Sequence, residues 1–372
     1  MTLSIKPLDI ILESEKIKCM LNIDEVNKII LDFQKQNKSL VFLYNVRHSY
    51  PNPDDLNTYL DTDYDDPKTI ETILNYLKKL NFNVLPLEAT SDIKQKLIDN
   101  KDQIGLVLNY SEAIIEGDRK KQITSVCEEL NIPFTGSSDY VQVLIRNKAD
   151  AKVEMRKFNI PVLPDQTFKD PSEPLLNNLT FPLIVKPIGQ GSSAGITNKS
   201  VVKNEEQLRT QLNEVIKNFK DSAIVEPFIT GQEFSVGMVG NPPKILPIIE
   251  PNMNTLPKGY EPIDSLEVKW LYEEQVTDHL TCPAEVDPTL KTIIEETALL
   301  VWNSLKIKDL CRIDMRCDKE GNLFVLEVNS PPGLLPPEIS TTSYFPLAAR
   351  TIGIEYGDLL KTIIASALQR YK

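Results

Sequence analysis

The feature that most constrains this chain is a pair of segments near its C-terminal end, residues 311–316 and 326–329, in which apolar and polar residues alternate. The alternation predicts two half-buried β-strands. Side chains two residues apart lie on the same face of a strand, so Arg312 and Asp314 share one face of the first strand. The polar residues of the second strand share a face for the same reason.

The two strands pair as a hairpin if residues 319–322 form a four-residue loop between them. Asp314 then lies opposite Glu327, and Arg312 lies opposite Asn329. Two carboxylates and one carboxamide form a hard oxygen-donor set that suits Mg²⁺ held jointly with phosphate groups. The arginine beside them can stabilise an anionic transition state. A solvated polar face on an ordinary hairpin is the alternative interpretation.

Composition excludes several classes of protein. The chain of 372 residues is long enough for two or three domains, and its net charge of −12 argues against nucleic acid or an anionic membrane as a partner. Its apolar stretches are too short for a membrane span, and no signal-peptide pattern follows Met1. Five scattered cysteines are typical of cytosolic thiols, and two histidines leave little scope for histidine chemistry. We therefore expect a cytoplasmic protein with neither nucleic-acid nor membrane partners.

The first third of the chain predicts an α/β domain. The first 40 residues are mostly helical in pattern and are expected to form an extension. Asp66 and Pro67 are typical of a helix start, as N-cap and first helical residue, and this helix is expected to run to about Leu80. Three apolar runs predict strands, at residues 40–44, 83–87 and 104–109. Strands and helices in alternation indicate a parallel sheet. A final helix is expected over residues 356–371.

A second polar region lies in the middle of the chain. The predicted strand 182–187 ends in Lys186 and Pro187, and residues 189–195 then contain three glycines and two serines. Free backbone amides and short hydroxyl side chains can fold over phosphate groups, with Lys186 as a point charge beside them. The lysine precedes the glycines, so the segment is neither a Walker A loop nor a dinucleotide-binding fingerprint. A mobile hairpin turn is the alternative.

Further segments stand in a fixed order with these two regions. They are Pro133–Ser137, Asn147–Asp150, Ile224–Ile229, Gly231–Val236, Glu327–Gly333 and Phe345–Ala348. In this order and spacing, residues 100–365 resemble the ATP-grasp superfamily and, within it, the D-alanine–D-alanine ligases. The resemblance implies an α/β (α+β) ATP-grasp fold of three domains, with the nucleotide held between the central and C-terminal domains. The implied division is an extension (1–40), an N-terminal α/β domain (41–136), a central lid domain (137–227) and a catalytic domain (228–372).

The resemblance also implies a role for each matching residue. Phosphate groups of ATP would be contacted by Lys148, Lys186, Ser192, Ser193 and Lys269, the last reaching toward the γ-phosphate. Adenine and ribose would be held by Glu226, the backbone of Pro227 and Ile229, and Glu233. Two Mg²⁺ ions, with Mn²⁺ as the alternative, would be bound by Asp314, Glu327 and Asn329. Catalysis would involve Arg312, Lys269, Ser192 and the backbone of Gly333.

Three departures from the ligase pattern concern the substrate. Residues 108–113 contain no histidine where the ligases have a His-Gly segment. The segment between Gly333 and Ser343 is longer than in the ligases and rich in proline. Trp270 stands where the ligases have a tyrosine next to the active-site lysine. Changes at a pocket wall alter which acid and amine fit, while the nucleotide chemistry stays the same.

The sequence therefore predicts an ATP-dependent carboxylate–amine ligase. It would join amino acids or short peptides through an acyl phosphate and release ADP and phosphate. D-alanine–D-alanine ligase proper, a carboxylase that activates bicarbonate, and a non-catalytic nucleotide-gated binding protein are the alternatives. The resemblance favours a homodimer, and the sequence names neither an interface nor the acid and amine that are joined.

Overall fold

The computed structural model describes residues 22–47, 64–116, 119–191, 193–265, 268 and 279–372. The helices are α2 (Ile23–Lys35), α3 (Pro67–Lys79), α4 (Ile93–Asn100), α5 (Thr124–Leu130), α6 (Asp139–Arg146), α7 (Lys148–Lys157), α8 (Glu205–Phe219), α9 (Pro288–Ser304), α10 (Tyr344–Thr351) and α11 (Tyr356–Arg370). The strands are β1 (Ser39–Tyr44), β2 (Val84–Glu88), β3 (Ile104–Asn109), β4 (Ile114–Glu116), β5 (Arg119–Lys121), β6 (Gln166–Phe168), β7 (Leu183–Pro187), β8 (Val201–Val202), β9 (Ala223–Pro227), β10 (Glu233–Val239), β11 (Lys244–Ile245), β12 (Glu250–Pro251), β13 (Leu280–Thr281), β14 (Leu310–Cys317) and β15 (Leu323–Asn329).

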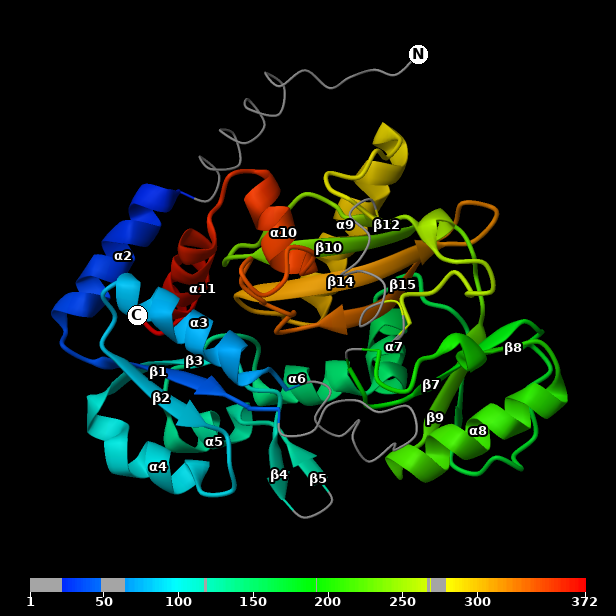
Figure 1. Ribbon diagram of the computed structural model, residues 1–372, viewed down its shortest axis with the longest axis horizontal. Helices are drawn as coiled ribbons and strands as arrows, with labels where there is room; N and C mark the ends of the chain where they lie inside the picture. The colour runs from blue at the N-terminus through cyan, green and yellow to red at the C-terminus, as the bar shows by residue number, and fades with distance from the viewer. Residues whose placement is uncertain (1–21, 48–63, 117–118, 192, 266–267, 269–278) are drawn as a thin grey trace.

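The first sheet is parallel and has the strand order β2–β1–β3 (Figure 1). This confirms the three predicted strands and the predicted parallel sheet. Helix α3 starts as expected, because the Asp66 side chain accepts a hydrogen bond from the backbone N–H of Lys68 and Pro67 is the first helical residue. Apolar residues of β1 and β3 pack on one face with α2, α3 and α11, and on the other face with α4 and α5.

The described part of the predicted N-terminal extension is a helix that joins this core. Helix α2 buries Val26, Ile29, Ile30 and Phe33 in the same apolar cluster as one face of β1. These positions recur every three to four residues, so they form one stripe along the helix. The structure thus places residues 23–35 against the first sheet, and the division of the chain into domains stays a prediction.

The second sheet is antiparallel, has the strand order β6–β9–β7–β8, and carries α8 on one face. Leu183 and Val185 of β7 are buried in the apolar cluster that includes α8. Because side chains alternate along a strand, Ile184 and Lys186 lie on the opposite face. The strand predicted to end near Lys186 is thereby confirmed, and its lysine faces away from α8.

The third sheet is antiparallel, has the strand order β11–β10–β14–β15, and contains the predicted hairpin as β14 and β15 (Figure 1). Cys311, Ile313 and Met315 of β14 are buried among apolar residues of α6, α7 and α9. Arg312 and Asp314 therefore lie on the face turned away from these helices. The alternating apolar and polar residues in the sequence of this strand therefore correspond to its buried face and its polar face.

The predicted register of the hairpin is confirmed at the site, but the predicted loop is wrong. Asp314 lies opposite Glu327, as expected. The backbone N–H of Asp318 donates to the carbonyl of Asn322 at 2.9 Å, so the loop consists of the three residues 319–321 rather than four. A loop shortened by one residue would move every pair of the hairpin by one position if the ladder were regular.

A β-bulge at Leu326 restores the register. Met315 pairs with Val325 and Asp314 pairs with Glu327, which leaves Leu326 as an extra residue between the two pairs. In a regular strand Glu327 would share a face with Val325, which is fully buried in the apolar core. The bulge turns Glu327 to the face of Asp314. The sequence-based hairpin had a loop that was one residue too long and a ladder without the bulge. These two errors cancel, so the predicted pairing of Asp314 with Glu327 is correct.

The chain ends with α11, where the sequence predicts the final helix. Helix α11 packs against α2 and α10 and so connects the first sheet with the third. Among the described residues, no helix has both the length and the apolar character needed to cross a bilayer.

Candidate active site

Polar residues form rows across three neighbouring strands of the third sheet. Strands β10, β14 and β15 align the rows Gly237–Arg312–Asn329 and Ser235–Asp314–Glu327, and β10 and β14 align Glu233 with Arg316. Direct contacts connect neighbours within the rows: the Ser235 hydroxyl donates to Asp314 at 2.5 Å, and Arg316 Nη1 lies 3.2 Å from a Glu233 carboxylate oxygen. The residues predicted to bind ribose and metal thus share one surface.

Asp314 is the most heavily engaged carboxylate of this surface. It is 7% exposed and accepts hydrogen bonds from Arg312 Nε at 2.9 Å, Arg312 Nη2 at 2.8 Å and Asn329 Nδ2 at 2.9 Å. Asn329 Nδ2 also lies 3.4 Å from Glu327. Asn329 therefore contacts both of the other predicted metal ligands, and the guanidinium of Arg312 is the cation beside Asp314.

Arg312 is held in place from two sides. Its guanidinium lies over the ring of Tyr344, 5.4 Å from the ring centroid, in addition to its bidentate contact with Asp314. Burial disfavours the charged guanidinium, but Asp314 and Glu327 outweigh this effect and raise the pKa of Arg312 above its usual value. Arg312 therefore presents a permanent, oriented positive charge.

Lys148 contacts both the glycine-rich loop, residues 189–195, and Glu327, one of the predicted metal ligands. It is the first residue of α7, whose N-cap Asn147 accepts hydrogen bonds from the backbone N–H groups of Ala149 and Asp150. The ammonium group of Lys148 donates to the carbonyl of Gln190 at 2.6 Å and lies 3.7 Å from Glu327. A lysine predicted to contact phosphate thus lies between the loop and a predicted metal ligand.

Glu226 is the centre of a buried ion pair that the sequence did not reveal. Its carboxylate contacts Lys152 of α7 and lies 3.0 Å from Lys186, and both Glu226 and Lys152 are 1% exposed. Lys152 was missed, although it lies one helical turn after Lys148, a spacing that places both on one face of α7. Glu226 therefore contacts two lysines at once, and its predicted contact with adenine stays a prediction.

A small cavity lies between the second and third sheets. It is lined by the predicted nucleotide residues Lys186, Ser193, Pro227, Ile229 and Glu233, and by Glu327. Ser193 has a left-handed backbone, with φ 57°, and its hydroxyl donates to the carbonyl of Asp264 at 2.7 Å. Two predicted residues, Ser192 and Lys269, lie outside the described part of the chain.

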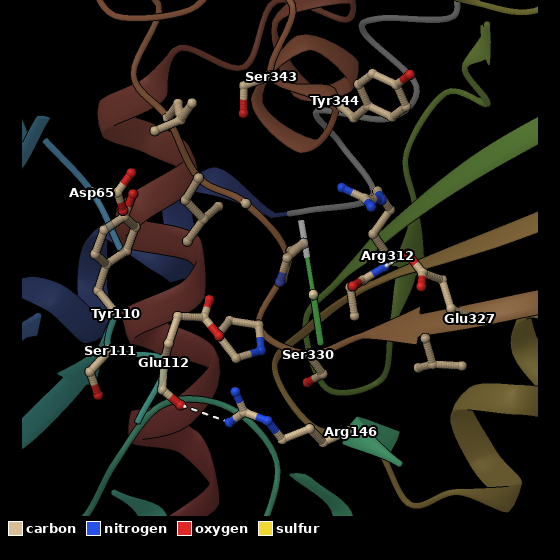
Figure 2. Close-up of a pocket in the computed structure, with 18 of the residues that line it drawn as sticks. Asp65, Tyr110, Ser111, Glu112, Arg146, Arg312, Glu327, Ser330, Ser343 and Tyr344 are labelled. Atoms are coloured by element: carbon tan, nitrogen blue, oxygen red, sulfur yellow. Dashed lines mark hydrogen bonds between the residues drawn. The ribbon is translucent and has the colours of Figure 1, made fainter. Parts of the chain in front are cut away.

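A larger cavity of about 480 Å³ opens on the other side of Glu327 (Figure 2). Its walls come from the segment that follows β3, from α6, from β14 and β15, and from the segment before α10. Figure 2 shows Tyr110 and Glu112 facing Arg312 and Glu327 across it, with Ser343 and Tyr344 at a third side. Gly333 also lines it, as the predicted oxyanion role requires. Two of the segments that depart from the ligase pattern, 108–113 and 333–343, thus form its walls.

The ammonium group of Lys186 is expected to give ATP use a pH dependence. Burial lowers the pKa of Lys186 from its usual 10.5 to about 8. The charged form binds phosphate, so kcat/KM for ATP should fall as the pH rises through about 8, where Lys186 loses its proton. Lys186→Arg should lack this falling limb, because arginine stays charged. The check is a pH profile of kcat/KM for both proteins, and the same limb in Lys186→Arg would contradict the assignment.

Fold and site together define the class of protein. The structure matches a crystal structure of D-alanine–D-alanine ligase from Bacillus anthracis complexed with ATP, with a TM-score of 0.64 and 20% sequence identity over 89% of this chain and 98% of that chain. A second structure of the Bacillus anthracis ligase matches with a TM-score of 0.62. The fold is therefore the ATP-grasp fold, and the expectation from the sequence is confirmed.

The chain belongs to the D-Ala-D-Ala ligase family, because the model of that family's C-terminal region matches residues 152–365. It is 29% identical to a D-alanine–D-alanine ligase of Pelotomaculum thermopropionicum over 81% of this chain and 92% of the relative. It is 31% identical to an uncharacterized protein of Sinorhizobium fredii over 72% of this chain and 76% of the relative. The protein is thus an ATP-grasp ligase that forms carbon–nitrogen bonds.

Proposed function

We propose that the protein joins a carboxylate to an amine through an acyl phosphate, with release of ADP and phosphate. The observation that carries this proposal is the position of Glu327, which lines both the small cavity between the sheets and the larger cavity. A nucleotide in the small cavity and a carboxylate in the larger one would meet beside Glu327, Asp314 and Lys148. This is where phosphoryl transfer needs neutralised charge and fixed positions.

The donor set at this junction fits Mg²⁺, and Mn²⁺ is the alternative. Among the described residues no three His, Cys, Asp or Glu side chains gather at one point, so the ligands would be the two carboxylates Asp314 and Glu327 with the carboxamide of Asn329. The contact of Asp314 with the guanidinium of Arg312 supports this proposal, because a cation already lies beside this carboxylate. Two metal ions, when bound there, would neutralise charge on the transferring phosphoryl group.

The residues of the chain would divide the two chemical steps between them. In the first step the substrate carboxylate attacks the γ-phosphorus, the bond to ADP breaks, and Lys148 and Lys186 hold the phosphate oxygens. In the second step the amine attacks the acyl carbon, and the bond to phosphate breaks. Arg312 and the backbone N–H of Gly333 would stabilise the oxyanion. The glycine-rich loop would exclude water, which would otherwise hydrolyse the acyl phosphate.

The substrates would be amino acids or short peptides. The relatives named D-alanine–D-alanine ligase support this class. We favour a substrate pair other than D-alanine with D-alanine, which remains the alternative. The reason is that residues 108–113 and 333–343 depart from the ligase pattern and line the larger cavity. A homodimer, a cytoplasmic location and the absence of nucleic-acid or membrane partners remain predictions of the sequence.

The test is phosphate release from Mg-ATP across a matrix of paired D- and L-amino acids and short peptides, with the nucleotide products separated by chromatography. We expect ADP to form only with a specific pair, because the acyl phosphate needs one acid and its release as amide needs one amine. AMP as the product would overturn the acyl-phosphate mechanism. ATP binding with no turnover for any pair would favour a nucleotide-gated binding protein instead.

A further inference from the structure

The floor of the larger cavity carries an arginine to which the ligase pattern gives no role. Arg146 is the last residue of α6 and lines the cavity near Glu112 (Figure 2). Its Nε donates to the carbonyl of Gly189 at 3.3 Å, and its Nη1 donates to the carbonyl of Glu112 at 3.4 Å. The two bonds orient the guanidinium between the segment that follows β3 and the glycine-rich loop.

The partners of Arg146 are electrically neutral. When the Gln122 amide is oriented to satisfy its neighbours, its oxygen accepts from Arg146 Nη1, and its nitrogen donates to the carbonyl of Glu112 at 3.1 Å and to Gln142 at 3.3 Å. Within the described part of the chain, no carboxylate forms an ion pair with Arg146. Lys148 and Arg312, which line the same cavity, each lie beside a carboxylate.

The Nη2 nitrogen of Arg146 is available to bind a ligand. Nη2 donates to no acceptor in the described structure, and the half-buried side chain of Arg146 lines the cavity. In Figure 2 the guanidinium of Arg146 lies at the edge of the space enclosed by Glu112, Ser330 and Arg312. A pre-oriented guanidinium with an accessible N–H is suited to binding a carboxylate.

We propose that Arg146 binds a second carboxylate of the acid substrate, distinct from the carboxylate of that same molecule that the reaction activates. The inference rests on the proposed function and narrows it: the molecule whose carboxylate is activated is a dicarboxylic amino acid or a peptide with an acidic side chain. A partly buried arginine with only neutral partners favours an anion over its neutral isostere, because the anion supplies the charge that the carbonyl groups lack.

Succinate and succinamate are the probes that test this subsite, because they differ only in whether the second group is a carboxylate or an amide. Binding is measured by calorimetry with the full chain saturated with Mg-ADP. We expect succinate to bind about 10- to 150-fold more tightly than succinamate, the range of a hydrogen bond to a charged group. Arg146→Met should abolish this preference, and Arg146→Lys should keep part of it. Lys157→Met, which removes an exposed cation from the neighbouring α7, should leave it unchanged.

The outcomes separate a binding role from a structural one. If Arg146 only supported the glycine-rich loop, Arg146→Met would weaken both probes equally, and the preference for succinate would persist. That result, or a wild-type protein that binds succinate no better than succinamate, would overturn the proposal. An Arg146-dependent preference without ADP formation for any pair would leave the subsite in place and overturn the ligase function. If a specific pair gives ADP but the protein binds succinate no better than succinamate, the ligase function stays in place and the subsite at Arg146 is overturned.

Discussion

Glu327→Gln is expected to lower the rate of ADP formation by roughly a hundred- to a thousand-fold without unfolding the protein. Glu327 lines both cavities, lies opposite Asp314 and has Lys148 at 3.7 Å, so its charge acts where the two substrates would meet. Glutamine preserves the volume of the side chain but removes the charge and weakens a hard metal-binding group. The Glu327 side chain is 33% exposed, so the loss of its own charge costs little, while the ammonium group of Lys148, which is 8% exposed, keeps its hydrogen bond to the carbonyl of Gln190.

The measurement is the turnover rate at saturating ATP, together with the Mg²⁺ concentration that gives half of the maximal rate and the thermal midpoint of unfolding. Glu320→Gln is the matched control, because Glu320 lies in the exposed loop of the same hairpin. We expect the control to behave as the wild type in all three measurements. Near-normal turnover of Glu327→Gln would remove Glu327 from the reaction centre, whereas a large drop in its thermal midpoint would assign it a structural role.

Asp309→Ala is expected to lower the free energy of unfolding by about 3–5 kcal/mol. Asp309 is fully buried and accepts hydrogen bonds from the backbone N–H of Gly136 at 2.7 Å, from Asn241 Nδ2 at 2.5 Å and from Ser366 at 3.1 Å. Arg370, at the end of α11, adds two more at 3.0 and 2.7 Å. One carboxylate thus connects three parts of the chain, and its removal leaves a partly buried guanidinium without its charge partner.

Urea unfolding followed by circular dichroism measures this loss. Asp99→Ala is the control, because Asp99 is exposed on α4 and its loss should change stability by no more than about 0.5 kcal/mol. The double variant Asp309→Ala/Arg370→Met should recover part of the loss, because it removes the guanidinium that the single variant leaves unpaired. A single variant as stable as Asp99→Ala would show that the network contributes nothing measurable.

Local sequence patterns were sufficient for most of the fold. Alternating residues in β14 and β15, the N-cap Asp66 and the apolar runs of the first sheet each predict an element that the structure contains. These signals are local, because the period of the apolar residues reflects which face of one strand or helix is buried. The loop of the hairpin was the exception, since a three-residue and a four-residue loop differ by one residue that periodicity does not resolve.

The site was only partly predictable for the same reason. Asp314, Arg312 and Lys186 could be selected by residue type and position on a strand. Lys152 could not, because a lysine on a helix is usually exposed, and only the tertiary structure places it against the buried Glu226. Arg146 likewise looks like an ordinary residue at the end of a helix until the cavity around it is known.

The sequence by itself determined the ATP-grasp class, the three strands of the first sheet, the hairpin of β14 and β15, and the residue types that carry the chemistry. Tertiary structure alone decided that Lys152 lies buried against Glu226 and that Arg146 lies in the same cavity as Arg312. The physical reason is distance along the chain. Periodicity reports the surroundings of a single element, whereas a cavity or a buried ion pair forms from residues that are far apart in sequence and meet only when the sheets pack.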